Sequence, residues 1–156
     1  MSIRYTPRNA HGWTLIELLF AVTVVGTLAA LATSSYAQFR KRLLIAQAKV
    51  DLSTFMQVFE RFRSSNNGSL PLSLADVGLA GQRDPWGNPY VYLNFATVQG
   101  KGQMRKDHNL VPINTEFDLY SKGPDGESVA PLTAKASRDD IIVANDGGFI
   151  GSASDY

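Results

Sequence analysis

The chain contains no cysteine and only two histidines among its 156 residues. The absence of cysteine excludes disulfides, thiol catalysis and cysteine-based zinc sites, so the fold must be held by its core or by an ion. The histidines are His11 and His108, and no nucleophile elbow, phosphate-binding glycine loop or metalloprotease helix accompanies them. We therefore predict that the chain is not an enzyme.

The chain also lacks a charge excess of either sign. Fifteen basic and 14 acidic residues give a formal net charge of +1, so nothing in the charge balance favours a nucleic acid partner.

What the chain does have is one long apolar segment near its start. From Trp13 to about Ala32 the only charged residue is Glu17. Twenty helical residues span about 30 Å, the thickness of the hydrocarbon core of a bilayer. An ionisable side chain at that depth is costly, so Glu17 is predicted to have a function.

Two ordinary kinds of apolar amino-terminal segment, a cleaved signal and a signal anchor, explain this segment less completely. A cleaved secretory signal has a shorter apolar region and a cleavage site between small residues. An uncleaved signal anchor matches the length but gives no reason for Glu17, unless that side chain simply reaches to the membrane surface.

The residues around Gly12 resemble a known processing site. Gly12 is followed by Trp-Thr-Leu-Ile-Glu, and this arrangement resembles the prepilin cleavage site of the type IV pilin superfamily. The resemblance implies that a prepilin peptidase cuts between Gly12 and Trp13 and methylates the new amino terminus at Trp13. It also implies that Glu17 neutralises the terminal amine of a neighbouring subunit in a filament. Residues 1–12 are then a leader, and 13–36 form a transmembrane or filament-core helix.

The chain departs from the family pattern in two places. Trp13 stands where the family usually has Phe or Met, and Ser34 stands where many members have a proline, leaving Gly26 as the weak point of the helix. The basic residues at 40–42 follow the span, and a count of positive charge alone would place them in the cytoplasm. The leader motif favours the opposite orientation, which we predict.

The helix is expected to continue beyond the membrane. Over residues 37–66, apolar side chains recur at three- and four-residue spacing and form one stripe. They are Ala48, Leu52, Phe55, Met56, Phe59 and Phe62. The stripe predicts that this part of the helix packs on a globular head formed by residues 67–156.

A second segment is more specific than the first. Residues 84–90 read Asp-Pro-Trp-Gly-Asn-Pro-Tyr, which predicts turns that lead into a strand with alternating Tyr90 and Tyr92. The segment resembles a signature of the major pseudopilins of type II secretion. The predicted fold is therefore α+β and type IV pilin-like, with a long amino-terminal helix packed on a small antiparallel sheet.

A third segment matches the same family. A predicted strand ends in a Gly-Pro-Asp-Gly turn at 123–126, and another begins after Asp139 and Asp140. In the proteins that it resembles, this loop binds one calcium ion. The resemblance implies carboxylate ligands from Asp125 and from one or both of Asp139 and Asp140, and a carbonyl ligand from Lys122. From the residues alone, a plain turn followed by a solvated strand start is favoured over a metal site.

Two connections are longer than in the proteins that the chain resembles, at 94–115 and 127–138. The first carries several glycines and basic residues, which predicts a mobile, solvated loop with partner contact as the alternative.

Together these segments imply a structural subunit of a type II secretion-like pseudopilus. It would be anchored once in the bacterial inner membrane with its head in the periplasm, and would polymerise into a helical filament that drives protein export. The implied partners are further copies, minor pseudopilins, an inner-membrane platform with its assembly ATPase, the prepilin peptidase and the outer-membrane secretin. A type IV pilin of surface fibres for adhesion, motility or DNA uptake stays open, as does a singly anchored binding module.

Overall fold

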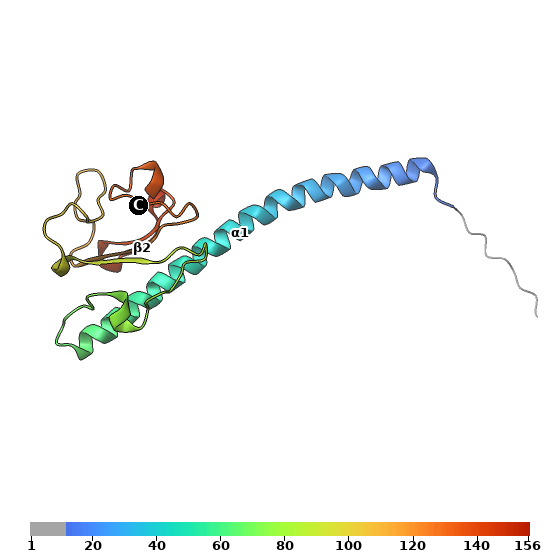
Figure 1. The fold of residues 1–156 in the computed structure, drawn as a ribbon. Coiled ribbons are helices and arrows are strands. Elements are labelled where there is room, and N and C mark those ends of the chain that lie inside the picture. Colours follow the sequence, from blue (N-terminus) through green and yellow to red (C-terminus); the bar gives the residue numbers. More distant parts are fainter. Residues whose placement is uncertain (1–11) are drawn as a thin grey trace, which may run out of the picture. The chain divides into compact units, whose positions relative to one another are not determined.

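The computed structural model of the chain describes residues 12–156, so all of the predicted leader except Gly12 lies outside the described residues. The chain divides into two compact units, of which the first ends at Arg40 and the second is Lys41–Tyr156. One helix, α1 (Leu15–Ser65), continues through this boundary (Figure 1). The predicted long helix is confirmed.

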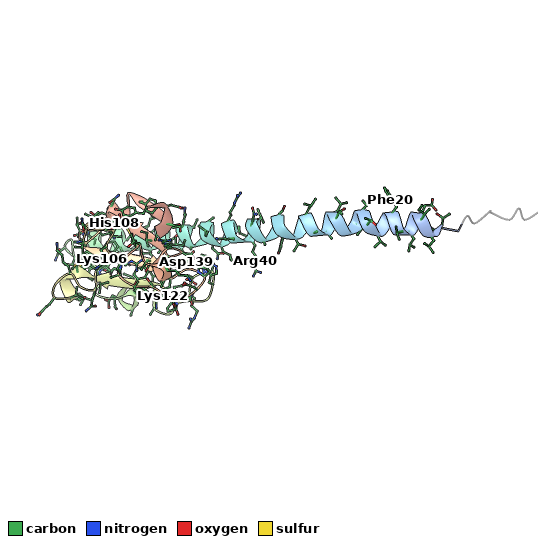
Figure 2. The ribbon with its side chains drawn as sticks, turned by 90° about the horizontal axis from the view of Figure 1, so that it is seen from above. Phe20, Arg40, Lys106, His108, Lys122 and Asp139 are labelled. Carbon is green, nitrogen blue, oxygen red and sulfur yellow. The ribbon has the colours of Figure 1, made fainter. Side chains whose placement is uncertain are left out.

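The first part of α1 is exposed on all sides. Figure 2 shows apolar side chains such as Phe20 projecting from the helix, and Phe20 is 72% exposed. Three threonines in this part, Thr23, Thr27 and Thr33, donate their hydroxyls to helix carbonyls three or four residues earlier at 2.7–2.8 Å. Their polar groups are therefore satisfied within the helix, as an apolar surrounding requires.

The head contains one four-stranded antiparallel sheet. Its strands are β1 (Val91–Asn94), β2 (Phe117–Ser121), β3 (Ile141–Ala144) and β4 (Phe149–Ser152), and they are paired in chain order. Val91 pairs with Tyr120, Tyr120 with Ile142 and Ile142 with Gly151, so the strands form a simple meander. The predicted small antiparallel sheet is confirmed.

The phenylalanine stripe of α1 covers one face of this sheet. Leu52 and Phe59 are almost completely buried, and the ring of Phe59 lies 4.8 Å from that of Tyr92 and 5.4 Å from that of Phe117. Ile141 and Val143 of β3 join this cluster, which also includes Ala48, Phe55, Tyr90 and Leu119. The stripe is confirmed as core, although Phe62 at its end is only half-buried.

The other face of the sheet is covered by loops. Ile142 and Ala144, which alternate with Ile141 and Val143 along β3, pack with Ile113, Leu132 and Ala153. All four residues of β3 are buried, because the strand has a helix on one side and loop segments on the other.

This packing corrects the expectation for residues 94–115. The segment is not a solvated loop throughout, since Met104, Arg105, Ile113 and Asn114 are all buried. His108 at its tip is exposed, as expected. The basic composition was misleading because the guanidinium of Arg105 is directed into the head, where it has an ion-pair partner.

Strand β4 was not predicted from the sequence. It follows a short turn at Asn145–Gly147, in which Asn145 and Asp146 adopt positive φ angles of 51° and 53°. Asparagine, aspartate and glycine tolerate that conformation and are typical of hairpin turns, so the Asn-Asp-Gly run before Phe149 was an available signal.

We predict that Phe59→Ala lowers the free energy of unfolding of the head by about 3–5 kcal/mol, because it removes a buried ring and leaves a cavity. Val50→Ala is the control, since Val50 lies on the same helix but is 63% exposed. It should change stability by no more than about 0.5 kcal/mol. Chemical denaturation of the full chain in detergent micelles measures both. Equal effects of the two variants would contradict the packing described here.

Candidate functional site

The amino-terminal end of α1 is closed by a reciprocal pair of hydrogen bonds. The carboxylate of Glu17 accepts from the backbone nitrogen of Thr14 at 3.0 Å and from its hydroxyl at 2.8 Å, and the Thr14 hydroxyl accepts from the Glu17 nitrogen at 3.3 Å. Thr-x-x-Glu is the sequence of a capping box, a signal that the sequence analysis missed. Glu17 thus has a local role within one chain, and its role between chains stays a prediction.

The apolar segment that follows is long enough to cross a membrane. Within residues 12–156, α1 is the one helix that meets this criterion of length and composition, and its most apolar 18-residue window has a mean hydropathy of 2.3 with no part of it buried. This agrees with the predicted span at 13–36.

The 84–90 segment of the head is organised around the carboxylate of Asp84. Asp84 is 5% exposed and accepts from the backbone nitrogens of Trp86 at 3.0 Å and Asn88 at 2.8 Å. Its second oxygen accepts from the hydroxyl of Ser121, at the end of β2, at 2.5 Å. Asp84 therefore shapes the turn and fastens it to the sheet.

Asn88 fastens the same turn to the predicted calcium loop. Its amide donates to the carbonyl of Gly123 at 2.8 Å. The amide oxygen also lies so close to Gly126 that a Cβ there would be 2.9 Å from it. The two segments that carry the resemblance are thus one structural unit, although about 35 residues separate them.

The ends of the 122–140 loop meet at Gly123. Gly123 has a φ of +66°, and a Cβ added there would overlap the carbonyl oxygen of Asp139 and lie 2.8 Å from its carbonyl carbon. Only glycine accommodates both the positive φ and this contact. Lys122, half-buried, lies next to this contact, between Gly123 and the end of β2.

The predicted carboxylate ligands separate into two groups. Asp125 and Asp139 line one groove of about 610 Å³, together with the cationic Lys135 and Arg138. The Asp125 carboxylate also accepts from the backbone nitrogen of Glu127 at 2.9 Å, which forms a local turn.

Asp140 has a different environment. It is completely buried, and its Oδ2 atom accepts from the guanidinium of Arg105 at 2.5 Å and from the hydroxyl of Ser128 at 2.6 Å. Burial raises the pKa of Asp140 to about 6, while the Ser128 hydroxyl and Arg105 oppose that rise. Burial also raises the pKa of Asp118, whose carboxylate accepts from the Arg105 backbone nitrogen at 2.6 Å.

Comparison with known proteins finds homologues among pilin-type proteins. The type II secretion system core protein G of Pseudomonas aeruginosa is 28% identical over 140 residues, which cover 77% of this chain and 87% of that protein. The type IV major pilin protein PilA of Myxococcus xanthus is 34% identical over 107 residues, which cover 69% of this chain. These two homologues match the resemblance to the type IV pilin superfamily. The chain spans 46% of the length of the Myxococcus pilin. No family model and no solved structure matches it.

The calcium ligands implied by the resemblance do not fit as a complete set. Within residues 12–156, no group of three or more acidic, histidine or cysteine side chains is placed to hold a metal ion. Asp140 does not line the groove shared by Asp125 and Asp139, because its carboxylate is held by Arg105 and Ser128. Calcium at Asp125, Asp139 and the Lys122 carbonyl stays a prediction, and Asp140 is corrected to a member of a buried ion pair.

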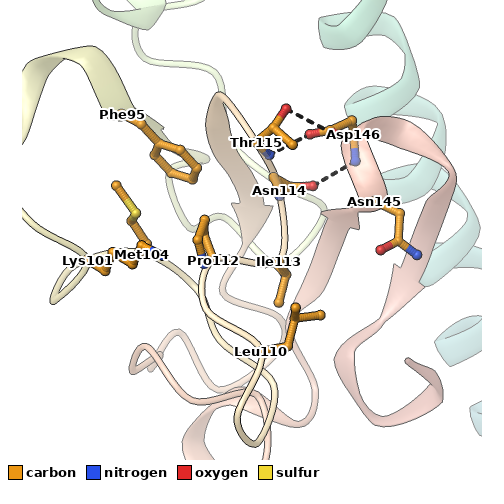
Figure 3. Close-up of a pocket in the computed structure, with 10 residues that line it drawn as sticks. All are labelled: Phe95, Lys101, Met104, Leu110, Pro112, Ile113, Asn114, Thr115, Asn145 and Asp146. Carbon is orange, nitrogen blue, oxygen red and sulfur yellow. Dashed lines mark hydrogen bonds between the residues drawn. The ribbon is translucent and has the colours of Figure 1, made fainter.

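The 94–115 segment also borders a second groove, of about 710 Å³ (Figure 3). Its walls are mainly apolar and include Phe95, Met104 and Ile113. Its one carboxylate, Asp146, accepts from the Thr115 backbone nitrogen at 2.7 Å and from the Thr115 hydroxyl at 3.0 Å. These bonds close the β3–β4 turn onto the segment before β2, so the carboxylate has a structural partner.

Sequence reasoning missed Arg105, Asp84 and Asn88 as organising residues. The 84–90 motif was recognised, but its polar side chains bond to residues far away in the sequence, and no local pattern announces that. Arg105 had no signal beyond the basic composition of its segment, which favoured the opposite conclusion.

We predict that Gly123→Ala destabilises the head by at least about 1 kcal/mol more than Gly78→Ala. Both glycines have a positive φ, +66° and +71°, so both substitutions carry the backbone penalty of about 1–2 kcal/mol. Only at Gly123 does the new Cβ overlap Asp139, since nothing lies within 4 Å of a Cβ at Gly78. Denaturation midpoints in micelles measure the difference, and equal losses would show that the loop ends do not meet.

Proposed function

We propose that this chain is the major structural subunit of a type II secretion-like pseudopilus. The observation that carries the proposal is its similarity over 87% of the type II secretion core protein G. The shape of the 84–90 turn around Asp84 supports it, because the segment that is most specific in sequence is also the one that connects helix, sheet and loop.

The chemistry of the proposed role is polymerisation. The first part of α1 exposes large apolar side chains on every side, including Leu15, Ile16 and Leu31, which are 69–83% exposed. Such a surface is stable only in lipid or against other apolar helices. In the membrane it is covered by lipid, and in a filament it is covered by the same helix of neighbouring subunits.

Glu17 has the role of directing assembly. Its charge lies in the apolar segment, where it is costly unless it meets an opposite charge. Cleavage after Gly12 creates such a charge at the amine of Trp13, and a neighbouring subunit can present it. The capping contact with Thr14 holds the carboxylate at the helix start until then.

The cellular setting follows from this role. The chain is anchored in the inner membrane with its head in the periplasm, is processed by a prepilin peptidase, and is assembled by a platform protein and an ATPase. Minor pseudopilins and the outer-membrane secretin are its further partners. No catalytic step is assigned to it.

A type IV pilin of surface fibres is the second candidate, since the Myxococcus major pilin is 34% identical in the aligned part. That alignment covers 46% of the pilin, whereas the alignment to core protein G covers 87% of that protein. The difference in coverage favours the pseudopilus.

We predict that Glu17→Gln blocks incorporation into fibres while leaving processing intact. Glutamine at this position keeps the capping box but removes the charge. Thr14→Ala is the matched control, because it disrupts the cap and leaves the charge, so it should still assemble. Fibre yield is measured by shearing and sedimentation, and processing by the mass of the mature chain. Normal yield from Glu17→Gln would exclude the charge-pairing role, and failure of Thr14→Ala alone would assign the effect to the cap.

Deletion of the gene should remove specific proteins from the culture medium and leave surface fibres unchanged. The comparison is made by mass spectrometry of the medium and by electron microscopy of the same cells, with the intact gene restored as the control. Loss of surface fibres with an unchanged set of released proteins would move the chain to the surface-pilin class.

A further inference from the structure

The guanidinium of Arg105 is a buried cation among the loops that cover the face of the sheet opposite α1. The side chain is 3% exposed and the carboxylate of its partner Asp140 is 0% exposed. A charge at such depth is destabilising unless a counter-charge and hydrogen bonds compensate for the lost hydration. Arg105 therefore has to be explained by what it binds.

Arg105 binds three kinds of oxygen from the 122–140 loop. One terminal nitrogen donates to the hydroxyl of Ser128 at 2.6 Å and to the carbonyl of Val129 at 2.7 Å. The other donates to the carboxylate of Asp140 at 2.5 Å. The Ser128 hydroxyl in turn donates to Asp140 at 2.6 Å, so the three groups form a closed triangle.

Two further contacts hold Arg105 in place. The guanidinium lies 4.4 Å from the centre of the Tyr120 ring on β2, within the range of a cation–π contact. The Arg105 backbone nitrogen donates to Asp118, also on β2, at 2.6 Å. Arg105 thus connects the strand before the loop, the middle of the loop and the residue that precedes β3.

The set of oxygens around Arg105 is of the type that a divalent cation takes from an irregular loop: a carboxylate, a carbonyl and a hydroxyl. Here these oxygens accept hydrogen bonds from a guanidinium, whose planar group can donate to several acceptors at once. Asp140 is common to this triangle and to the calcium ligands expected from the sequence, and in this geometry its Oδ2 atom is occupied by Arg105 and Ser128.

We propose that Arg105 is the built-in cation of the 122–140 loop, and that it orders this loop in the folded head without a bound calcium ion. The long 94–115 segment delivers it, so the unusual length of that segment has a structural purpose. The proposal concerns the head alone and does not depend on the filament role.

Two buried atoms of this ion pair have no hydrogen-bond partner among the described residues, Nε of Arg105 and Oδ1 of Asp140. The network is therefore not saturated, and its strength rests on the contacts of the terminal nitrogens. Methionine at 105 would keep the aliphatic volume but leave Asp140 as an uncompensated buried charge.

The test uses the mature full chain in detergent micelles, with calcium or with an excess of chelator. Two quantities are measured: the melting temperature of the head, and the rate of trypsin cleavage after Lys135 and Arg138, which lie exposed in the loop. The variants are Arg105→Met, the double variant Arg105→Met/Asp140→Leu, and Lys106→Met. Lys106 is the matched control. Its hydrogen bonds to Ala130 and Leu132 are made by the backbone, so the substitution does not remove them.

The expected result is a wild-type chain whose melting temperature and cleavage rate are the same with calcium and with chelator, contrary to the calcium site that the resemblance implies. Arg105→Met should be cleaved at least about tenfold faster in both conditions, because the loop opens when its cation is lost. The double variant should regain most of the protection, since a buried ion pair can be replaced by apolar residues of similar volume. Lys106→Met should behave as wild type.

Three outcomes would overturn the proposal. The first is a wild-type chain that loses protection on chelation to the extent expected of Arg105→Met. The second is an Arg105→Met chain that keeps its protection. The third is a double variant that regains none, which would show that Asp140 has another essential ligand. If Arg105→Met does not fold, the chelation series and the double variant still decide.

Discussion

The contact between the phenylalanine stripe of α1 and the sheet is the interaction on which the rest of the head depends. The chain has no disulfide, so apolar burial has to hold the sheet to the helix. Phe59 meets Tyr92 of β1 and Phe117 of β2, and Leu52 and Ala48 continue the contact toward the amino terminus. The helix therefore has two different parts. Its first part exposes apolar side chains on all sides, and its second part buries one apolar stripe against the sheet.

Apolar burial on the two faces of the sheet leaves the connecting loops to be ordered by different means. Here polar side chains with buried partners do this work. Asp84 fixes its own turn and binds Ser121, and Asn88 binds the carbonyl of Gly123. The Asp84 carboxylate accepts from three donors, and a buried polar group that is paired in this way stabilises a small core rather than weakening it.

The elements that the sequence predicted are those with a strong local pattern. The long helix has an apolar stripe whose periodicity its burial explains, and the strands after Pro89 and around Tyr120 lie next to turn signals. The capping box at Thr14 and the turn before β4 had local signals that could have been used. The burial of Arg105 had none, because its partners Ser128 and Asp140 lie 23 and 35 residues away. A basic composition favours exposure to water, but a charged side chain becomes buried where a partner distant in the sequence pairs with it.

A cation that belongs to the chain differs physically from one taken from solution. The stabilisation by a bound ion grows with its free concentration and disappears when the ion is removed, whereas a side chain is present whenever the chain is folded. The arginine also brings geometric demands, since it must be delivered by a segment long enough to reach beneath the loop. The 94–115 segment meets this requirement, because its residues Met104 and Ile113 are buried along with Arg105. Loop length and the source of the cation are therefore parts of one structural solution, and a shorter connection between β1 and β2 would leave Asp140 in need of an ion.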